Sequence, residues 1–400
     1  MELNRIQELA RENDTKILLF VIDGLGGLPM SDGKTALEAA KTPALDGLAA
    51  NAECGLHVPV APGITPGSGP AHLGVFGYDP LQYEVGRGVL SALGIGFDLQ
   101  PGDVAVRGNF CTVDGAGTVT DRRAGRIPTE KCVELCEILR TIEVPDATVF
   151  VEPVKEYRFL LVLRGENLSG RLEDTDPQAT GKKPLNPKAH TADAEKAIQA
   201  VSAFVEQAHE RLQGHEPANM VLLRGFSQRP DWPRFPEVFK LRAAAIAGYP
   251  MYRGVARLAG MNVLDTGSEI SEEAATLETH WRDYDFFYLH AKPTDSAGED
   301  GDFEKRVSLL ETIDKEVARV TALEPDVLVV TGDHSTPALM QYHSWHPVPL
   351  LLHSRYCRPD AAREFGERAC VAGCLGPMLP AKDIMPLAMA HARRLEKFGA

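Results

Sequence analysis

Short apolar runs in regular alternation with helical segments constrain the fold of this chain more than any other feature. Residues 16–22 (KILLFVI) form a continuous, partly β-branched run, which is typical of a strand buried inside a parallel sheet. In the second half of the chain, strand and helix segments alternate with the rhythm of βαβ units. The segments expected there are 219–223, 238–247, 262–264, 271–281, 286–290, 301–322, 327–331 and 348–352. We therefore expect an α/β protein whose mostly parallel sheet carries helices on both faces.

A different pattern begins near residue 104, where short strand segments replace this alternation. The segments expected there are strands over 104–113, 148–151 and 157–163 and a helix over 129–140. Such a mixture is typical of a small α+β insertion. The predicted organisation is a discontinuous core, residues 1–103 and 185–400, with an inserted domain of residues 104–184. The linkers near 100–105 and 180–190 are the expected hinges.

Charge and composition limit the partners of the chain. The net charge is −14 at pH 7, so bulk electrostatic attraction to nucleic acid or to an anionic membrane is not expected. The longest early apolar run, residues 17–22, is too short to span a bilayer, and the first residues lack the apolar run of a signal peptide. We therefore expect a cytoplasmic protein whose seven cysteines, which include no C-x-x-C pair, are reduced thiols.

Ser68 lies in a loop rich in Gly and Pro, directly before residues 71–76, which suit a helix. One interpretation is a helix N-cap, whose hydroxyl accepts a hydrogen bond from an early helix N–H. The other is a nucleophile at a helix N-terminus, where unpaired N–H groups and the helix dipole favour an anion such as phosphate. The loop alone leaves both interpretations open, and acidic and histidine residues elsewhere in the chain favour the second.

Several of these acidic and histidine residues directly follow predicted strands. Asp23 follows the first apolar run, and the adjacent Asp333 and His334 follow residues 327–331 after one glycine. In open α/β sheets, ligands bind beyond the carboxyl ends of the strands. We therefore expect these three side chains to converge at one edge of the sheet.

A second set of candidate ligands lies nearby in the sequence. Asp295 and Glu299 follow the strand 286–290 and share one face if their loop turns helically, and His343 lies beyond Asp333. Mixed carboxylate and imidazole ligands suit Mn²⁺, Zn²⁺ or Co²⁺. Two such ions about 4 Å apart form a clamp for phosphoryl transfer. An ion at this place would also lower the pKa of the Ser68 hydroxyl.

Three arginines, Arg122, Arg123 and Arg126, lie close together in the predicted insertion. Clustered arginines usually form a solvated face. Between a strand and a helix they are equally suited to bind a carboxylate and a phosphate bidentately. The sequence leaves both interpretations open.

Seven motifs together resemble one family over nearly the whole chain, namely the archaeal-type 2,3-bisphosphoglycerate-independent phosphoglycerate mutases of the alkaline-phosphatase superfamily. They are FVIDGLGGLP (20–29), TPGSGPAHLGVFGYDP (65–80), GRGVLSALGIGFDLQPGDVAVRGNF (86–110), DRRAGRI (121–127), LVLRGENLSG (161–170), TDSAGEDGDFEKRV (294–307) and TGDHSTP (331–337). The resemblance implies an alkaline-phosphatase-like fold with an inserted lid domain. It also implies an isomerase that moves phosphate between O3 and O2 of glycerate with two metal ions, and phosphoglycerate is then the expected small-molecule partner.

The resemblance also implies roles for individual residues. Ser68 is the expected nucleophile that becomes phosphoserine. One metal is expected among Asp23, Ser68, Asp333 and His334, and the other among Asp295, Glu299 and His343. Arg122, Arg123 and Arg126 are the candidates for binding glycerate, and Lys292 is expected to stabilise the transferring phosphoryl group.

The sequence departs from the family pattern at Glu299, because members of the superfamily commonly carry histidine at this position. We expect Glu299 to replace that histidine as a ligand, with His346 as the alternative, since relatives often carry Asp or Asn at the latter position. A carboxylate ligand favours Mn²⁺ or Mg²⁺ over Zn²⁺, so Mn²⁺ is the expected ion, with Mg²⁺, Zn²⁺ and Co²⁺ as alternatives.

Two other functions are compatible with the same residues. A related phosphatase, or a phosphotransferase acting on another small alcohol such as homoserine, would use the same site, because function depends on the site and not on the fold. A metal-binding regulatory protein without catalysis is a third interpretation, which only the departure at Glu299 favours.

Overall fold

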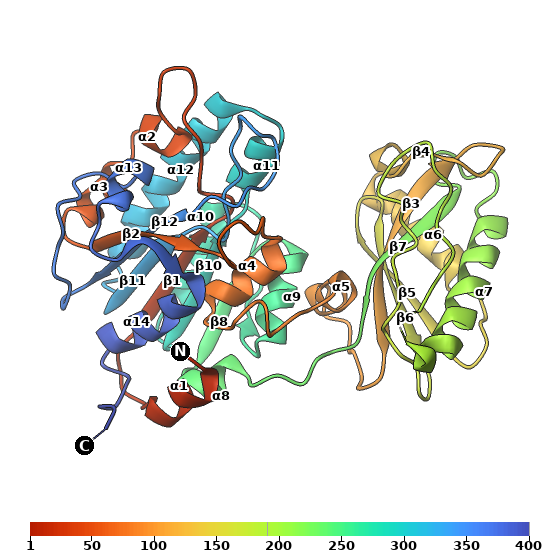
Figure 1. The fold of residues 1–400 in the computed structure, drawn as a ribbon, viewed down its shortest axis with the longest axis horizontal. Helices are drawn as coiled ribbons and strands as arrows, with labels where there is room; N and C mark the ends of the chain where they lie inside the picture. Colours follow the sequence, from red (N-terminus) through yellow and green to blue (C-terminus); the bar gives the residue numbers. More distant parts are fainter. Residues whose placement is uncertain (190, 400) are drawn as a thin grey trace. The chain divides into compact units, whose positions relative to one another are not determined.

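A computed structural model describes residues 1–189 and 191–399, which form two compact units (Figure 1). The first unit comprises Met1–Glu84 and the chain from Trp232 onward, and the second comprises Val85–Asp231. The second unit is therefore wider than the expected insertion of residues 104–184. The expected hinges lie inside it, and the segment 180–190 contains His190, which is outside the described residues.

The first unit is built on one eight-stranded sheet with the strand order β13-β2-β12-β11-β1-β10-β8-β9. The strands are β1 (Ile17–Ile22), β2 (Glu53–Val58), β8 (Ala243–Ile246), β9 (Asn262–Val263), β10 (Phe286–Ala291), β11 (Val327–Thr331), β12 (Val348–Ser354) and β13 (Gly376–Pro380). Only β12 runs antiparallel to its neighbours in this described sheet, and the other neighbouring pairs are parallel. The expected α/β class with a mostly parallel sheet is confirmed. Because β12 is reversed, the loop before it lies at the same edge as the carboxyl ends of β1, β10 and β11.

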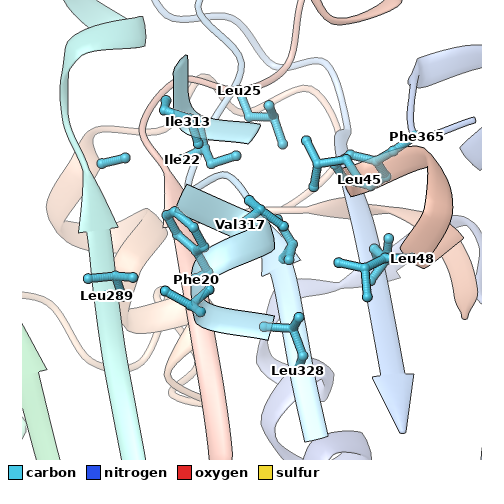
Figure 2. Close-up of a cluster of buried hydrophobic side chains, with 14 of the residues drawn as sticks. Phe20, Ile22, Leu25, Leu45, Leu48, Leu289, Ile313, Val317, Leu328 and Phe365 are labelled. Atoms are coloured by element: carbon cyan, nitrogen blue, oxygen red, sulfur yellow. The ribbon is translucent and has the colours of Figure 1, made fainter. Parts of the chain in front are cut away.

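Helices cover both faces of this sheet. The helices of the first unit are α1 (Leu3–Leu9), α2 (Ala36–Ala39), α3 (Pro43–Ala49), α4 (Ser68–Val75), α8 (Phe235–Phe239), α9 (Pro250–Leu258), α10 (Ile270–His280), α11 (Pro293–Glu299), α12 (Phe303–Thr321), α13 (Glu367–Val371) and α14 (Ile384–His391). On one face, side chains of α3 and α12 pack on β1, β10 and β11, and Figure 2 shows Val317 of α12 near Phe20 and Ile313 near Ile22. These side chains form a continuous buried core, which holds in place the edge of the sheet where the loops after β1, β10 and β11 begin.

Strand β10 shows how the sheet separates its two faces. Phe287 and Leu289 belong to the core beneath α12. Their alternates Phe286, Tyr288 and His290 point to the opposite face, because successive side chains of a strand alternate. There Phe286 packs on α8, with its ring centroid 4.7 Å from that of Phe235. The same alternation therefore places a buried histidine, His290, on the face of α4, α8 and α9.

The second unit contains a five-stranded antiparallel sheet. Its strands are β3 (Val104–Val113), β4 (Val119–Asp121), β5 (Thr148–Lys155), β6 (Arg158–Arg164) and β7 (Met220–Ser227), with the order β4-β3-β6-β5 and β7 paired to β3. Its helices are α5 (Arg87–Gly94), α6 (Thr129–Leu139) and α7 (Glu195–Arg211), and α6 and α7 share one buried core with the sheet. The α+β character agrees with the sequence, whereas β7 and α7 extend this unit well past residue 184.

The sequence analysis expected one continuous segment over 238–247, and this expectation is wrong. It is not one segment, because α8 ends at Phe239 and strand β8 begins at Ala243. The strand sequence AAAI favours a helix by propensity. The segment nevertheless forms a buried strand between β10 and β9, because tertiary packing overrides a weak propensity.

Two further expectations concern the chain as a whole. No helix of the described residues combines the length and the apolar character that a membrane crossing requires. All seven cysteines are free thiols in the described chain.

Candidate metal centre

Ser68 is the first residue of α4, and Gly67 occupies the N-cap position. The interpretation of Ser68 as a helix N-cap is therefore wrong. Its hydroxyl instead faces His334, with Oγ 3.3 Å from Nε2. The side chain is only partly buried, so the hydroxyl combines access with a position at a helix N-terminus.

Asp23, Asp333 and His334 form what we call the inner group. One ligand atom from each lies within 4.8 Å of the others, and all three residues are fully buried. The carboxylate oxygens Asp23 Oδ1 and Asp333 Oδ2 lie 3.5 and 3.2 Å from His334 Nε2. The structure therefore brings together three residues predicted from strand ends, and it places them beside Ser68.

Neighbouring hydrogen bonds determine which atoms of the inner group are free to bind a cation. The Thr336 hydroxyl donates to Asp295 Oδ1 at 2.8 Å, so its oxygen accepts from His334 Nδ1–H at 3.0 Å. His334 Nε2 then carries a lone pair. Asp333 Oδ1 accepts from the Gly24 N–H at 3.0 Å, which leaves Oδ2 directed at the other ligands.

Asp295, His343 and the shared His334 form what we call the outer group. Asp295 lies in the first turn of α11 and is buried, and His343 Nε2 lies 3.5 Å from Asp295 Oδ1. The His343 Nδ1–H donates to the Pro66 carbonyl at 3.0 Å, which leaves Nε2 as the lone-pair atom. The ring of His343 stacks on His334 at a centroid distance of 3.7 Å. His334 Nε2 thus faces Asp23 and Asp333, whereas His343 Nε2 faces Asp295.

Glu299 lies beside the outer group without being part of it. Its Oε1 atom is 3.9 Å from His343 Nε2, and its side chain is 55% exposed. Burial and the charge of Asp295 raise its pKa. The alternative, His346, hydrogen-bonds Ser344 Oγ and stacks on Trp345, and it belongs to neither group of candidate ligands in the described chain. The geometry thus favours Glu299 over His346.

Lys292 lies between the two groups. Its Nζ atom is 2.5 Å from Asp295 Oδ2 and 3.2 Å from Asp23 Oδ2. Burial acts against its charge, but these two carboxylates raise the pKa of Lys292 above its usual value. The ammonium group is therefore charged at neutral pH and sits at the centre of the acidic cluster.

The electrostatics of the inner group favour a bound cation. Burial and the charge of Asp23 raise the pKa of Asp333 well above its usual value. Burial lowers the pKa of His334 to about 3, so the imidazole is neutral and suited to ligation. Asp23 Oδ1 and Asp333 Oδ2 have no hydrogen-bond partner among the described residues. Because a buried unpaired carboxylate oxygen is costly, this donor set fits a divalent cation. The outer group offers the same ligand types, a carboxylate and an imidazole lone pair, but both Asp295 oxygens already accept hydrogen bonds from Thr336 and Lys292.

A buried arginine that the sequence analysis did not single out holds these loops together. Arg306 of α12 is 1% exposed and donates to the carbonyls of Gly24, Leu25 and Gly26 at 2.6, 2.7 and 3.0 Å, and also to the Thr336 carbonyl. It thereby joins the loop after β1 to the loop after β11. Only its position within the motif 294–307 could have indicated a role for Arg306 from the sequence.

Three more buried residues behind the inner group were also missed, namely His72, Tyr252 and His290. The Tyr252 hydroxyl donates to Asp23 Oδ2, and His290 Nε2 lies 3.5 Å from the same atom. His72 Nδ1–H donates to the Ser68 carbonyl at 2.8 Å and lies 3.3 Å from Asp333 Oδ2. In the sequence, each of them is a polar residue within a largely apolar segment, and this pattern alone does not predict a functional role.

In the second unit, the three predicted arginines differ in their surroundings. Arg122 binds Asp176 bidentately, at 3.0 and 2.6 Å, whereas Arg123 and Arg126 are exposed. Arg224, which the sequence analysis missed, lies 3.5 Å from the same Asp176. The buried carboxylate of Asp176 thus orients two guanidinium groups.

Comparisons with known proteins agree on one family. A family model described as 2,3-bisphosphoglycerate-independent phosphoglycerate mutase matches residues 49–218. Among curated proteins, probable 2,3-bisphosphoglycerate-independent phosphoglycerate mutases from Aquifex aeolicus and Thermus thermophilus are each 50% identical, over 99% of this chain and 99% and 98% of theirs.

Two solved structures resemble the chain over nearly its whole length. A Pyrococcus horikoshii protein superposes with a TM-score of 0.85 at 32% identity, covering 97% of this chain and all of that one. A cofactor-independent phosphoglycerate mutase from Thermoplasma acidophilum superposes with a TM-score of 0.71 at 29% identity, covering 94% of this chain and 100% of its own.

Proposed function

The chain belongs to the 2,3-bisphosphoglycerate-independent phosphoglycerate mutase family, and on this premise we propose how its residues interconvert 3-phosphoglycerate and 2-phosphoglycerate. The reaction is an isomerisation in which phosphate moves between O3 and O2 of glycerate. The observation that carries the proposal is the surroundings of His334 Nε2. The Ser68 hydroxyl lies 3.3 Å from this atom, and the unpartnered carboxylate oxygens Asp23 Oδ1 and Asp333 Oδ2 lie 3.5 and 3.2 Å from it.

Ser68 is the proposed nucleophile. Its Oγ loses its proton and forms a bond to phosphorus as the bond from phosphorus to O3 breaks, and O3 takes up a proton, which gives phosphoserine and glycerate. O2 of the same glycerate then attacks the phosphoserine, which gives 2-phosphoglycerate and restores the Ser68 hydroxyl. The phosphoryl oxygens gather at the N-terminus of α4, where unpaired N–H groups and the helix dipole favour negative charge.

Two divalent cations, with Mn²⁺ as the expected ion, are assigned to the inner and outer groups. The inner group and Ser68 Oγ would hold one, and Asp295, His343 and Glu299 would hold the other. When bound, such ions lower the pKa of a hydroxyl and stabilise the charge on a transferring phosphoryl group. Lys292 adds a positive charge between the two groups, suited to the same phosphoryl oxygens.

The second unit is assigned the binding of glycerate and the exclusion of water. Arg122 and Arg224, oriented by Asp176, can bind a carboxylate or phosphate bidentately, with Arg123 and Arg126 as further candidates. Water must be excluded because it would hydrolyse the phosphoserine. The chain crosses between the units at residues 84–85 and 231–232, which we propose as the hinges in place of 100–105 and 180–190. With its free thiols, the enzyme is proposed to work in the cytoplasm.

The test is phosphorus NMR of 3-phosphoglycerate with chelator-stripped protein and added Mn²⁺, using wild type, Ser68→Ala and Ser296→Ala. Ser296 is an exposed serine of α11 and serves as the matched control. We expect 2-phosphoglycerate without bulk inorganic phosphate from wild type and Ser296→Ala, and no conversion by Ser68→Ala.

Other results would contradict parts of this account. Inorganic phosphate as the main product would indicate a phosphatase that uses the same site. Full activity of Ser68→Ala would remove Ser68 as the nucleophile. No conversion by any protein would reject phosphoglycerate and direct the search to other phosphoryl donors and small alcohols.

A further inference from the structure

The two carboxylate oxygens of Asp23 have different surroundings. Oδ2 accepts the Tyr252 hydroxyl and lies 3.2 Å from Lys292 Nζ. Oδ1 has no hydrogen-bond partner among the described residues and lies 3.5 Å from His334 Nε2. One oxygen is therefore held by donors, whereas the other is directed at the inner group.

Packing fixes the Tyr252 hydroxyl in this position. Tyr252 extends from α9 and is 1% exposed. Its ring lies on His290 at a centroid distance of 3.7 Å and beside His72 at 4.9 Å. A tyrosine hydroxyl is protonated at neutral pH and therefore donates to the carboxylate. Because the ring is held by this packing, the hydroxyl stays directed at Asp23.

We propose that Tyr252 is a positioning residue whose hydroxyl occupies Asp23 Oδ2 and thereby directs Oδ1 to the inner cation. The inference rests on the proposed two-metal site and deepens it. Partners behind a metal ligand fix its orientation, and their removal typically weakens metal binding about 10- to 100-fold. Without the hydroxyl, the carboxylate can rotate toward Lys292 and share both oxygens with its ammonium group.

A second buried tyrosine provides the matched control. Tyr288 of β10 is fully buried on the same face of the sheet, and its ring centroid lies 5.6 Å from that of His72. Its hydroxyl has no hydrogen-bond partner among the described residues. Removal of either hydroxyl changes the packing of the same layer, but only the Tyr252 hydroxyl contacts a proposed ligand. A role in packing alone predicts similar effects for the two variants.

The experiment titrates chelator-stripped wild type, Tyr252→Phe and Tyr288→Phe with Mn²⁺, and measures free Mn²⁺ by electron paramagnetic resonance. We expect wild type and Tyr288→Phe to bind two ions with the same affinities. In Tyr252→Phe, one of the two sites should weaken 10- to 100-fold. Mutase activity of Tyr252→Phe should be low at limiting Mn²⁺ and return at saturating Mn²⁺, which loss of folding would not reproduce.

Each other result is decisive. If wild type binds no Mn²⁺ pair, the two-metal proposal fails. If wild type binds two ions and Tyr252→Phe binds them equally well, the positioning role is wrong. If both variants weaken the same site equally, packing accounts for the effect and the role is again wrong. Melting temperatures of the metal-free proteins identify an unfolded variant, for which Tyr252→Trp, which keeps a buried ring with an N–H donor, gives the replacement test.

Discussion

The inner and outer groups draw on the same edge of the sheet, but they differ in how far they are shielded from water. Asp23, Asp333 and His334 are all 0% exposed. In the outer group, the side chain of Asp295 is 5% exposed and that of His343 is 21% exposed, and the neighbouring Glu299 side chain is 55% exposed. Electrostatic interactions strengthen as water is excluded. The inner cation should therefore be held tightly, and the outer one should be weaker and exchange with solution.

The difference follows from the elements that carry the ligands. The inner ligands come directly after β1 and β11, where the loops are fixed by Arg306. The outer ligands come from α11 and from the loop before β12, both farther from the strands. A residue directly after a strand is held by the sheet, whereas His343 lies within the loop before β12 and is held less firmly.

The largest effect is expected for Asp333→Asn, which removes a charge from the inner group at nearly constant shape. The inner cation should be lost and kcat/KM should fall at least about 1,000-fold, or about 4 kcal/mol, because the metal stabilises the transferring phosphoryl group. Steady-state kinetics and metal content measured by mass spectrometry check this.

The control is Asp314→Asn on α12. Asp314 is also buried, and it accepts the N–H groups of Leu45 and Ala44 at 2.8 and 3.0 Å. It should lower thermal stability and leave metal content unchanged. Retention of both ions by Asp333→Asn would contradict the inner assignment.

His343→Ala should have an intermediate effect. It removes one ligand from the outer group while the inner group stays complete, so kcat/KM should fall about 100-fold and one tightly bound Mn²⁺ should remain. Mn²⁺ titration of the variant measures the remaining site directly. Loss of both ions would show that the two groups do not act as separate sites.

The sequence predicted that the three residues of the inner group lie together, because each of them follows a strand that could be recognised locally, and their role as ligands stays a prediction. Asp23 follows KILLFVI, and Asp333 and His334 follow VLVVT after one glycine. The topology of parallel sheets then brought them to one edge. No comparable rule identified Tyr252, because its role depends on α9 packing against β10, which lies outside any local pattern.

The second unit shows the same limit at the level of the fold. The segment 219–223 was correctly expected to be a strand but was assigned to the core. It belongs to β7, which pairs with β3, so that Ala105 lies opposite Ser227. Hydrophobic pattern identifies a strand but not its partner, and here the partner lies more than a hundred residues away. The site roles carried over from the family stay predictions until they are measured.

The smallest effect is expected for Glu299→Gln, because the Glu299 side chain is half exposed and lies 3.9 Å from His343. The outer site should weaken about 10-fold or less, with the inner site unchanged. Glu299→His, which places the residue common in the superfamily, should shift the preference of the outer site from Mn²⁺ toward Zn²⁺. Competition between the two metals measures this shift. Unchanged affinity and activity of Glu299→Ala would remove Glu299 as a ligand.

Anomalous diffraction from crystals grown with MnCl₂ tests the central claim most directly, since it locates the cations without reference to activity. The account predicts two manganese peaks near Ser68 Oγ. One should lie among Asp23, Asp333 and His334, with full occupancy, and the other should contact Asp295 and His343 with an occupancy that falls on brief chelation. A single peak, or peaks bound away from these two groups, would contradict the two-site account.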